Sequence, residues 1–152
     1  MPAENVNSEG KFNLDLLRLR AQEIRRAANV LAGYSNLSQE EFVSDQMVVD
    51  AAKYRLLVAI EAAASMCTHL AARLLGEAPS SYAQCFQVLA SSGIISPELA
   101  ERLAAMARFR NLSVHVYAEV DDSQVWEVLQ SDLGDLENYL SAIGAAVNDR
   151  LN

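Results

Sequence analysis

Aromatic residues are scarce in this sequence, at 7% of the chain, although 51% of its 152 residues are hydrophobic. No segment alternates between apolar and polar residues as a half-buried strand does. Alanine and leucine are abundant, which is typical of packed helices rather than of sandwiched strands. A chain of this length can bury a real core in one domain. We therefore expect an all-α fold.

Several signatures of catalysis and binding are also missing. The chain has no glycine-rich phosphate loop, no nucleophile elbow and no aromatic-basic signature of an RNA-binding module. Its two cysteines, Cys67 and Cys85, lack the spacing of a metal site or a disulfide framework, so we interpret them as reduced core thiols. Two histidines without clustered carboxylates supply too few metal ligands. We therefore expect neither a metal nor a cofactor.

Long apolar runs and an excess of positive charge are absent too. No apolar run has the length needed to cross a bilayer, and the polar start MPAENVNSEGK is no signal peptide. We expect a cytoplasmic protein without a membrane partner. The net charge of −8 argues against a general nucleic-acid coat. It is compatible with a nuclease whose basic groups are focused in one cleft.

Apolar residues recur at helical spacing almost throughout the chain. The repeat is interrupted by capping and helix-breaking residues: Gly33 and Asn36, Ser38 with Glu41, Gly76 and Pro79, Ser91-Ser92-Gly93, and Ser96-Pro97. These interruptions predict an up-and-down bundle of about five helices, the last beginning near Asp122.

The most informative pattern is an arginine followed at fixed spacing by a histidine and a tyrosine. Arg110, His115 and Tyr117 form the motif Arg-x4-His-x-Tyr within the run RNLSVHVY. An imidazole moves protons near neutral pH, and a guanidinium holds phosphate oxygens through two parallel hydrogen bonds. The pattern therefore favours phosphodiester chemistry.

Arg110 falls on the apolar seam of its predicted helix. Its charge must meet an anion, a polar cavity or a protein interface, because burying it alone is costly. On an ideal helix His115 lies about 140° away from Arg110. Either the helix breaks between them, near Asn111 or the β-branched run 113–116, or the arginine of one chain works with the histidine of another.

Each motif residue also has a structural interpretation. His115 could be a core histidine that bonds a backbone carbonyl, Arg110 could pair with Glu119 or Asp121, and Tyr117 could only pack.

A second polar group, Glu61, Ser65 and His69, lies at four-residue spacing on one helical stripe. This stripe is either the wall of an RNA cleft with a second proton carrier, or a hydrogen-bonded or solvated flank.

The stretch from Pro97 to Leu140, which contains the motif, resembles the HepT-like ribonucleases, the toxin halves of toxin–antitoxin pairs within the HEPN superfamily. The earlier segments SNLSQEEFVSD, YRLLVAIEAAASMCTHLAARLL and SYAQCFQVLASSGIIS resemble the same family in the same order. Ser65 stands where family members often carry an aspartate, and Ser113 where they usually carry an aliphatic residue.

The resemblance implies a HEPN-like bundle and a type VII-like toxin, a metal-independent endoribonuclease with tRNA among its candidate substrates. His115 would be the general base for the ribose 2′-hydroxyl, Arg110 would stabilise the transition state, and Asn111 would orient the histidine or contact a phosphate. A cognate MntA-like minimal nucleotidyltransferase would transfer AMP to Tyr117. Two motif copies would meet in a homodimer or a higher even-numbered assembly.

Other interpretations remain open. The chain could be a non-catalytic helical module that binds substrate or nucleotide for a nucleotidyltransferase, or a purely structural dimer. We divide it into an N-terminal amphipathic extension, residues 1–36, and a bundle, residues 37–152. The extension is the best candidate for packing against a second copy. It carries the densest basic cluster, Arg18, Arg20, Arg25 and Arg26, which is either a solvated face or a strip that guides RNA.

Overall fold

The computed structural model describes residues 12–114 and 121–151, apart from the side chains of 109, 111–114 and 151. All regular elements in these ranges are helices, which confirms the all-α expectation. They are α1 (Leu14–Tyr34), α2 (Gln39–Val43), α3 (Gln46–Leu75), α4 (Tyr82–Ser91), α5 (Pro97–Val114), α6 (Asp122–Ser131) and α7 (Leu133–Leu151).

The described residues form seven helices where the sequence predicted about five. One additional helix is α2, which begins at the predicted capping box of Ser38 and Glu41. The Glu41 amide donates to Ser38 Oγ, and the Ser38 amide donates to Glu41 Oε1, both at 3.1 Å. The other arises because the predicted last helix is divided at Asp132, the C-cap of α6. The helical spacing of apolar residues continues across this division, so the sequence pattern did not predict it.

The other helix boundaries follow local capping chemistry. Ser81 and Ser96 accept hydrogen bonds from Gln84 and Leu99 at 3.1 Å, at the starts of α4 and α5. Gly76 ends α3 in the left-handed conformation, with φ of 62°, which a residue without a Cβ adopts at little cost.

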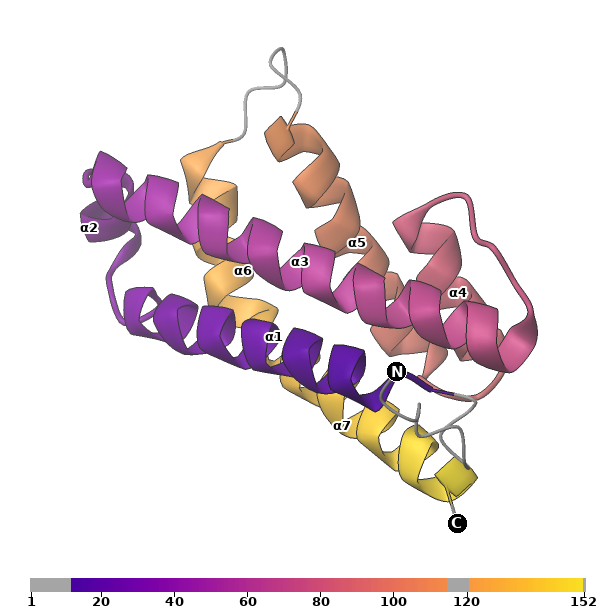
Figure 1. Cartoon of the computed structure of the whole chain (residues 1–152). Helices are drawn as coiled ribbons and strands as arrows, with labels where there is room; N and C mark the ends of the chain where they lie inside the picture. The colour runs from indigo at the N-terminus through magenta and orange to yellow at the C-terminus, as the bar shows by residue number, and fades with distance from the viewer. Residues whose placement is uncertain (1–11, 115–120, 152) are drawn as a thin grey trace.

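The long helix α3 crosses the middle of the molecule, α1 runs alongside it, and α7 lies beyond α1 (Figure 1). By length and composition α3 is apolar enough to span a membrane, which corrects the expectation that no run has that property. However, 56% of its most apolar window is buried inside the protein. Its residues belong to both hydrophobic clusters, so its central position explains its composition.

Helix α1 is packed into the bundle. Leu17, Ile24 and Ala27 are buried in the larger cluster, together with residues of α3, α4, α5 and α7. Leu31 joins the second cluster, which α1 shares with α2, α3 and α6. The division of the chain at residue 36 and the packing of the extension against a second copy stay predictions.

The two cysteines are free and buried, as expected. Burial raises the pKa of the Cys67 thiol far above its ordinary value. A protonated thiol in the core behaves as a small apolar side chain.

Candidate functional site

Arg110 of α5 is held by Glu61 of α3. The Nε–H of Arg110 donates to Glu61 Oε1 at 2.5 Å, with the two side chains 29% and 44% exposed. The arginine on an apolar seam thus meets an anion, one of the outcomes expected for it. At this exposure the ion pair contributes at most about 1 kcal/mol to stability. Its main consequence is to fix the orientation of the guanidinium plane.

Tyr82, at the start of α4, completes the cluster. Its hydroxyl donates to Glu61 Oε2 at 2.7 Å, and its ring lies beneath the guanidinium, 5.6 Å from Arg110 Cζ to the ring centroid. The hydrogen bond to Glu61 raises the pKa of Tyr82 above its ordinary value. We call Arg110, Glu61 and Tyr82 the arginine cluster. Sequence analysis missed Tyr82, because no spacing relates it to the motif.

The arginine cluster brings together side chains from three helices. Glu61 accepts from Tyr82 on one oxygen and from Arg110 on the other, so both oxygens of this carboxylate have donors. A carboxylate fixed in this way holds a guanidinium at a set angle. Guanidinium is the side-chain group that best matches phosphate oxygens, so the arrangement is suited to binding a phosphodiester.

The rest of the motif is partly outside the described residues. His115 and Tyr117 lie outside them, as does Glu119, and the side chain of Asn111 is not described. Helix α5 continues to Val114, immediately before the histidine, so the break considered at Asn111 is not there. Because His115 is outside the described residues, a contact between it and Arg110 is not described either. The catalytic roles of Arg110, Asn111 and His115 and the modification of Tyr117 stay proposals.

The stripe Glu61, Ser65 and His69 does not converge on one point. Ser65 Oγ accepts from Arg20 Nε of α1 at 3.1 Å. His69 Nε2 accepts from the backbone amide of Asn13, the N-cap of α1, at 2.9 Å. Only Glu61 of the stripe contacts Arg110 in the described interactions.

His69 has the chemistry of a structural acceptor. An imidazole nitrogen that accepts a hydrogen bond must be unprotonated, so the ring is neutral in this arrangement. Burial, and then the nearby charge of Arg73, lower the pKa of His69 below its ordinary value. The bond to Asn13 fits the hydrogen-bonded interpretation of this position better than the proton-carrier interpretation.

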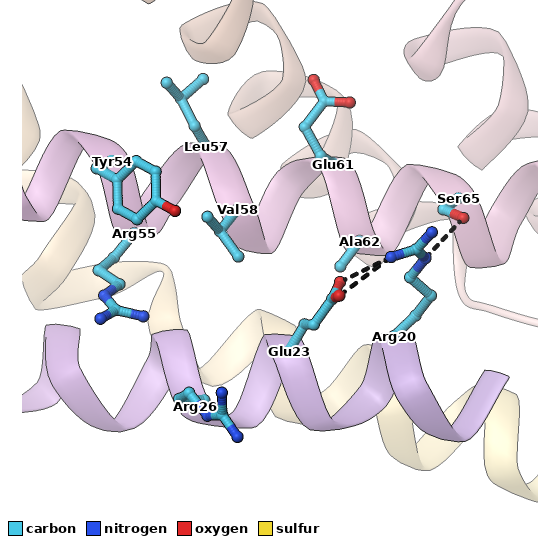
Figure 2. A pocket seen from close by; sticks show the side chains of 10 residues that line it. All are labelled: Arg20, Glu23, Arg26, Tyr54, Arg55, Leu57, Val58, Glu61, Ala62 and Ser65. Atoms are coloured by element: carbon cyan, nitrogen blue, oxygen red, sulfur yellow. Dashed lines mark hydrogen bonds and ion pairs between the residues drawn. The ribbon is translucent and has the colours of Figure 1, made fainter. Parts of the chain in front are cut away.

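A groove of about 620 Å³ lies between α1 and α3 (Figure 2). Its lining residues are Arg20, Glu23, Arg26, Tyr54, Arg55, Leu57, Val58, Glu61, Ala62 and Ser65. Two of the four arginines in the predicted basic cluster, Arg20 and Arg26, line this groove. The other two, Arg18 and Arg25, are exposed and do not line it. Glu61 belongs both to the groove and to the arginine cluster.

In residues 12–114 and 121–151, no group of three or more histidine, cysteine, aspartate or glutamate side chains is placed to hold a metal ion.

Comparisons with known proteins point to one family. Over 122 residues the chain is 27% identical to the "mRNA nuclease HepT" of Shewanella oneidensis, covering 80% of this chain and 88% of that protein. Over 132 residues it is 24% identical to the "tRNA nuclease HepT" of Aphanizomenon flos-aquae, covering 86% of this chain and 88% of that one.

Among solved structures, the chain resembles the tri-AMPylated HEPN toxin of Shewanella oneidensis in complex with MNT antitoxin. The TM-score is 0.80 at 25% identity, over 86% of this chain and 98% of that chain. The sequence model of the family described as "Ribonuclease HepT-like" matches residues 24–143, most of the chain. The chain therefore belongs to the HepT-like family of toxin–antitoxin ribonucleases, as its sequence resemblance indicated.

Proposed function

We propose that this ribonuclease cuts RNA without a metal ion, by attack of a ribose 2′-hydroxyl on the adjacent phosphate. The observation that carries the proposal is the guanidinium of Arg110, held by Glu61 at 2.5 Å, five residues before a histidine. The bond from the phosphorus to the 5′-oxygen breaks as the bond to the 2′-oxygen forms. The leaving 5′-oxygen takes up a proton from water, so the products are a 2′,3′-cyclic phosphate and a 5′-hydroxyl.

In this mechanism His115 is the general base that removes the proton of the 2′-hydroxyl. Arg110 stabilises the extra negative charge of the phosphorane-like transition state. Asn111 orients the histidine or donates to a phosphate oxygen. Glu61 and Tyr82 act through Arg110, by holding its guanidinium plane.

The site is completed by a second copy of the chain. Helix α5 continues to Val114, so four residues of helix follow Arg110 before the histidine is reached. A further helical step would place His115 about 140° around the axis from Arg110. The arginine of one protomer and the histidine of its partner can meet at a single phosphate across a homodimer, or across a higher even-numbered assembly.

The toxin is neutralised by a cognate MntA-like nucleotidyltransferase in the cytoplasm. The Tyr117 oxygen attacks the α-phosphorus of ATP, pyrophosphate leaves and the phenolic proton is lost. The added AMP brings negative charge and bulk to the place where substrate phosphate must bind. The tri-AMPylated state of the Shewanella toxin supports this proposal.

The test is cleavage of tRNA and of an mRNA transcript by the purified protein in excess chelator, with analysis of the ends. The relatives named as mRNA and tRNA nucleases motivate both substrates. We expect cyclic phosphate ends and no cutting of the matching DNA, which lacks the 2′-hydroxyl. Intact RNA, or loss of cutting with chelator, would contradict the proposal. RNA binding without any cutting would instead favour the non-catalytic binding module.

A further inference from the structure

The groove between α1 and α3 has an excess of positive charge on a chain whose net charge is −8. Three arginines and two glutamates line it. Glu23 is paired with Arg20 at 3.1 Å, and Glu61 is paired with Arg110 (Figure 2 shows the former pair). Each of the two glutamates is therefore paired with an arginine. The excess of positive charge in the groove comes from the remaining two arginines, Arg26 and Arg55.

Arg26 and Arg55 are placed to meet an anion from outside. In the described part of the chain, neither has a carboxylate within ion-pair distance. Arg26 is exposed and Arg55 is half-buried. Figure 2 shows Arg55 extending from α3 toward α1, the helix that carries Arg26. Two such guanidinium groups at one groove are typical of phosphate recognition.

An exposed aromatic side chain lies next to these cations. Tyr54 is 61% exposed, and it is the aromatic residue among the exposed large hydrophobic side chains of the described residues, the others being Leu19, Val43 and Met47. The guanidinium of Arg55 lies 5.8 Å from the centroid of its ring. A nucleobase can stack on an open aromatic face or on a guanidinium plane, and every base has such a face.

The groove also leads to the arginine cluster. Glu61 is one of the residues that line the groove, and its carboxylate holds Arg110. Tyr54 precedes Glu61 by seven residues on α3, which is about 10 Å along the helix axis. A short stretch of a single RNA strand spans that distance.

We propose that this groove binds the part of a single-stranded RNA that flanks the cut phosphate. Arg26 and Arg55 contact phosphate oxygens, and one unpaired base stacks on Tyr54. The inference rests on the proposed ribonuclease function, since it extends the same RNA strand away from Arg110. It assigns binding roles to residues that are outside the Arg-x4-His-x-Tyr motif.

The probe is a short fluorescein-labelled single-stranded RNA with methylated 2′-hydroxyls, which the full-length protein can bind but not cut. Its dissociation constant is measured by anisotropy at several salt concentrations. The variants are Arg26→Ala, Arg55→Ala and Tyr54→Ala. The matched controls are Arg25→Ala, an exposed neighbour outside the groove, and Tyr54→Phe, which keeps the ring.

We expect Arg26→Ala and Arg55→Ala each to reduce the slope of log affinity against log salt by about 0.7, the value for one lost phosphate contact on a single strand. Tyr54→Ala weakens binding about fivefold or more. Arg25→Ala and Tyr54→Phe stay close to the wild type. Melting temperatures verify that the variants are folded.

Two further measurements separate this inference from the function on which it rests. If the wild type cuts unmodified RNA but the groove variants bind as tightly as Arg25→Ala does, the inference is wrong and the ribonuclease mechanism stands. If the wild type cuts no RNA, the proposed mechanism is wrong whatever the groove binds. If light scattering shows that groove variants lose a dimer that Arg25→Ala retains, the groove is a contact between copies, which also overturns the inference.

Discussion

The hydroxyl of Tyr82 donates to Glu61 at 2.7 Å, on the carboxylate whose other oxygen accepts from Arg110. Tyr82 therefore acts on Arg110 in two ways, through the shared carboxylate and through its ring beneath the guanidinium. An arginine held in this way loses conformational freedom, which lowers the entropic cost of placing it against a phosphate in the proposed transition state.

Glu61→Gln should lower kcat about tenfold or more, because it removes the charge that orients Arg110. The melting temperature should change little, since the ion pair is partly exposed. Tyr82→Phe keeps the ring and loses one hydrogen bond, so its effect on kcat should be smaller. Steady-state cleavage kinetics measure both. Unchanged kcat in Glu61→Gln would show that the carboxylate does not position the arginine.

His69 should make stability depend on pH. Its pKa is lowered in the folded state, so the stabilisation is present above its unfolded pKa of about 6.5 and is lost as pH falls through the lower folded value. Urea unfolding at a series of pH values measures this loss. His69→Gln, which can still accept from Asn13, should show a shallower decline below about pH 6.5. Identical declines in the two proteins would mean that His69 is not the group responsible.

The protein should be a dimer, or a larger even-numbered assembly, by light scattering. Mixing Arg110→Ala with His115→Ala should restore part of the cleavage, because a mixed dimer contains one site with both intact residues. Each variant alone is the control. A monomer that cuts RNA would require both residues of a site to come from one chain.

Tyr117→Phe should cut RNA but resist neutralisation by the cognate nucleotidyltransferase with ATP. The variant lacks the oxygen that we propose as the acceptor of AMP, whereas the proposed cleavage mechanism does not use that oxygen. Intact-mass measurement should show AMP additions on the wild type and none on the variant. Equal labelling of both proteins would place the modification on another residue.

The helix boundaries that sequence analysis predicted are those set by a few neighbouring residues. Ser38 and Ser96 cap helices through hydrogen bonds to residues three positions later, so a short stretch of sequence is enough to predict these boundaries. The division at Asp132 was missed, because Leu129 and Leu136 keep a helical spacing of seven across it.

The sequence predicted that Arg110 needs a partner, but it did not predict which residues the partners are, because they are distant in the sequence. An arginine on an apolar seam predicts that an anion or an interface will meet it, and this follows from the energy of burying a charge. Its partner Glu61 is 49 residues away, and Tyr82 is 21 residues from Glu61. Only the packing of α3, α4 and α5 brings them together. Likewise, Ser65 and His69 share a stripe with Glu61, but α1 determines what they bind.

The central claim is that Arg110 and His115 carry out the cleavage and that folding does not depend on them. The most direct test measures RNA cleavage and the melting temperature of Arg110→Ala and His115→Ala in parallel with the wild type. We expect both variants to lose cleavage, while each loses only about 1–2 kcal/mol of stability. Full cleavage by either folded variant would contradict the mechanism.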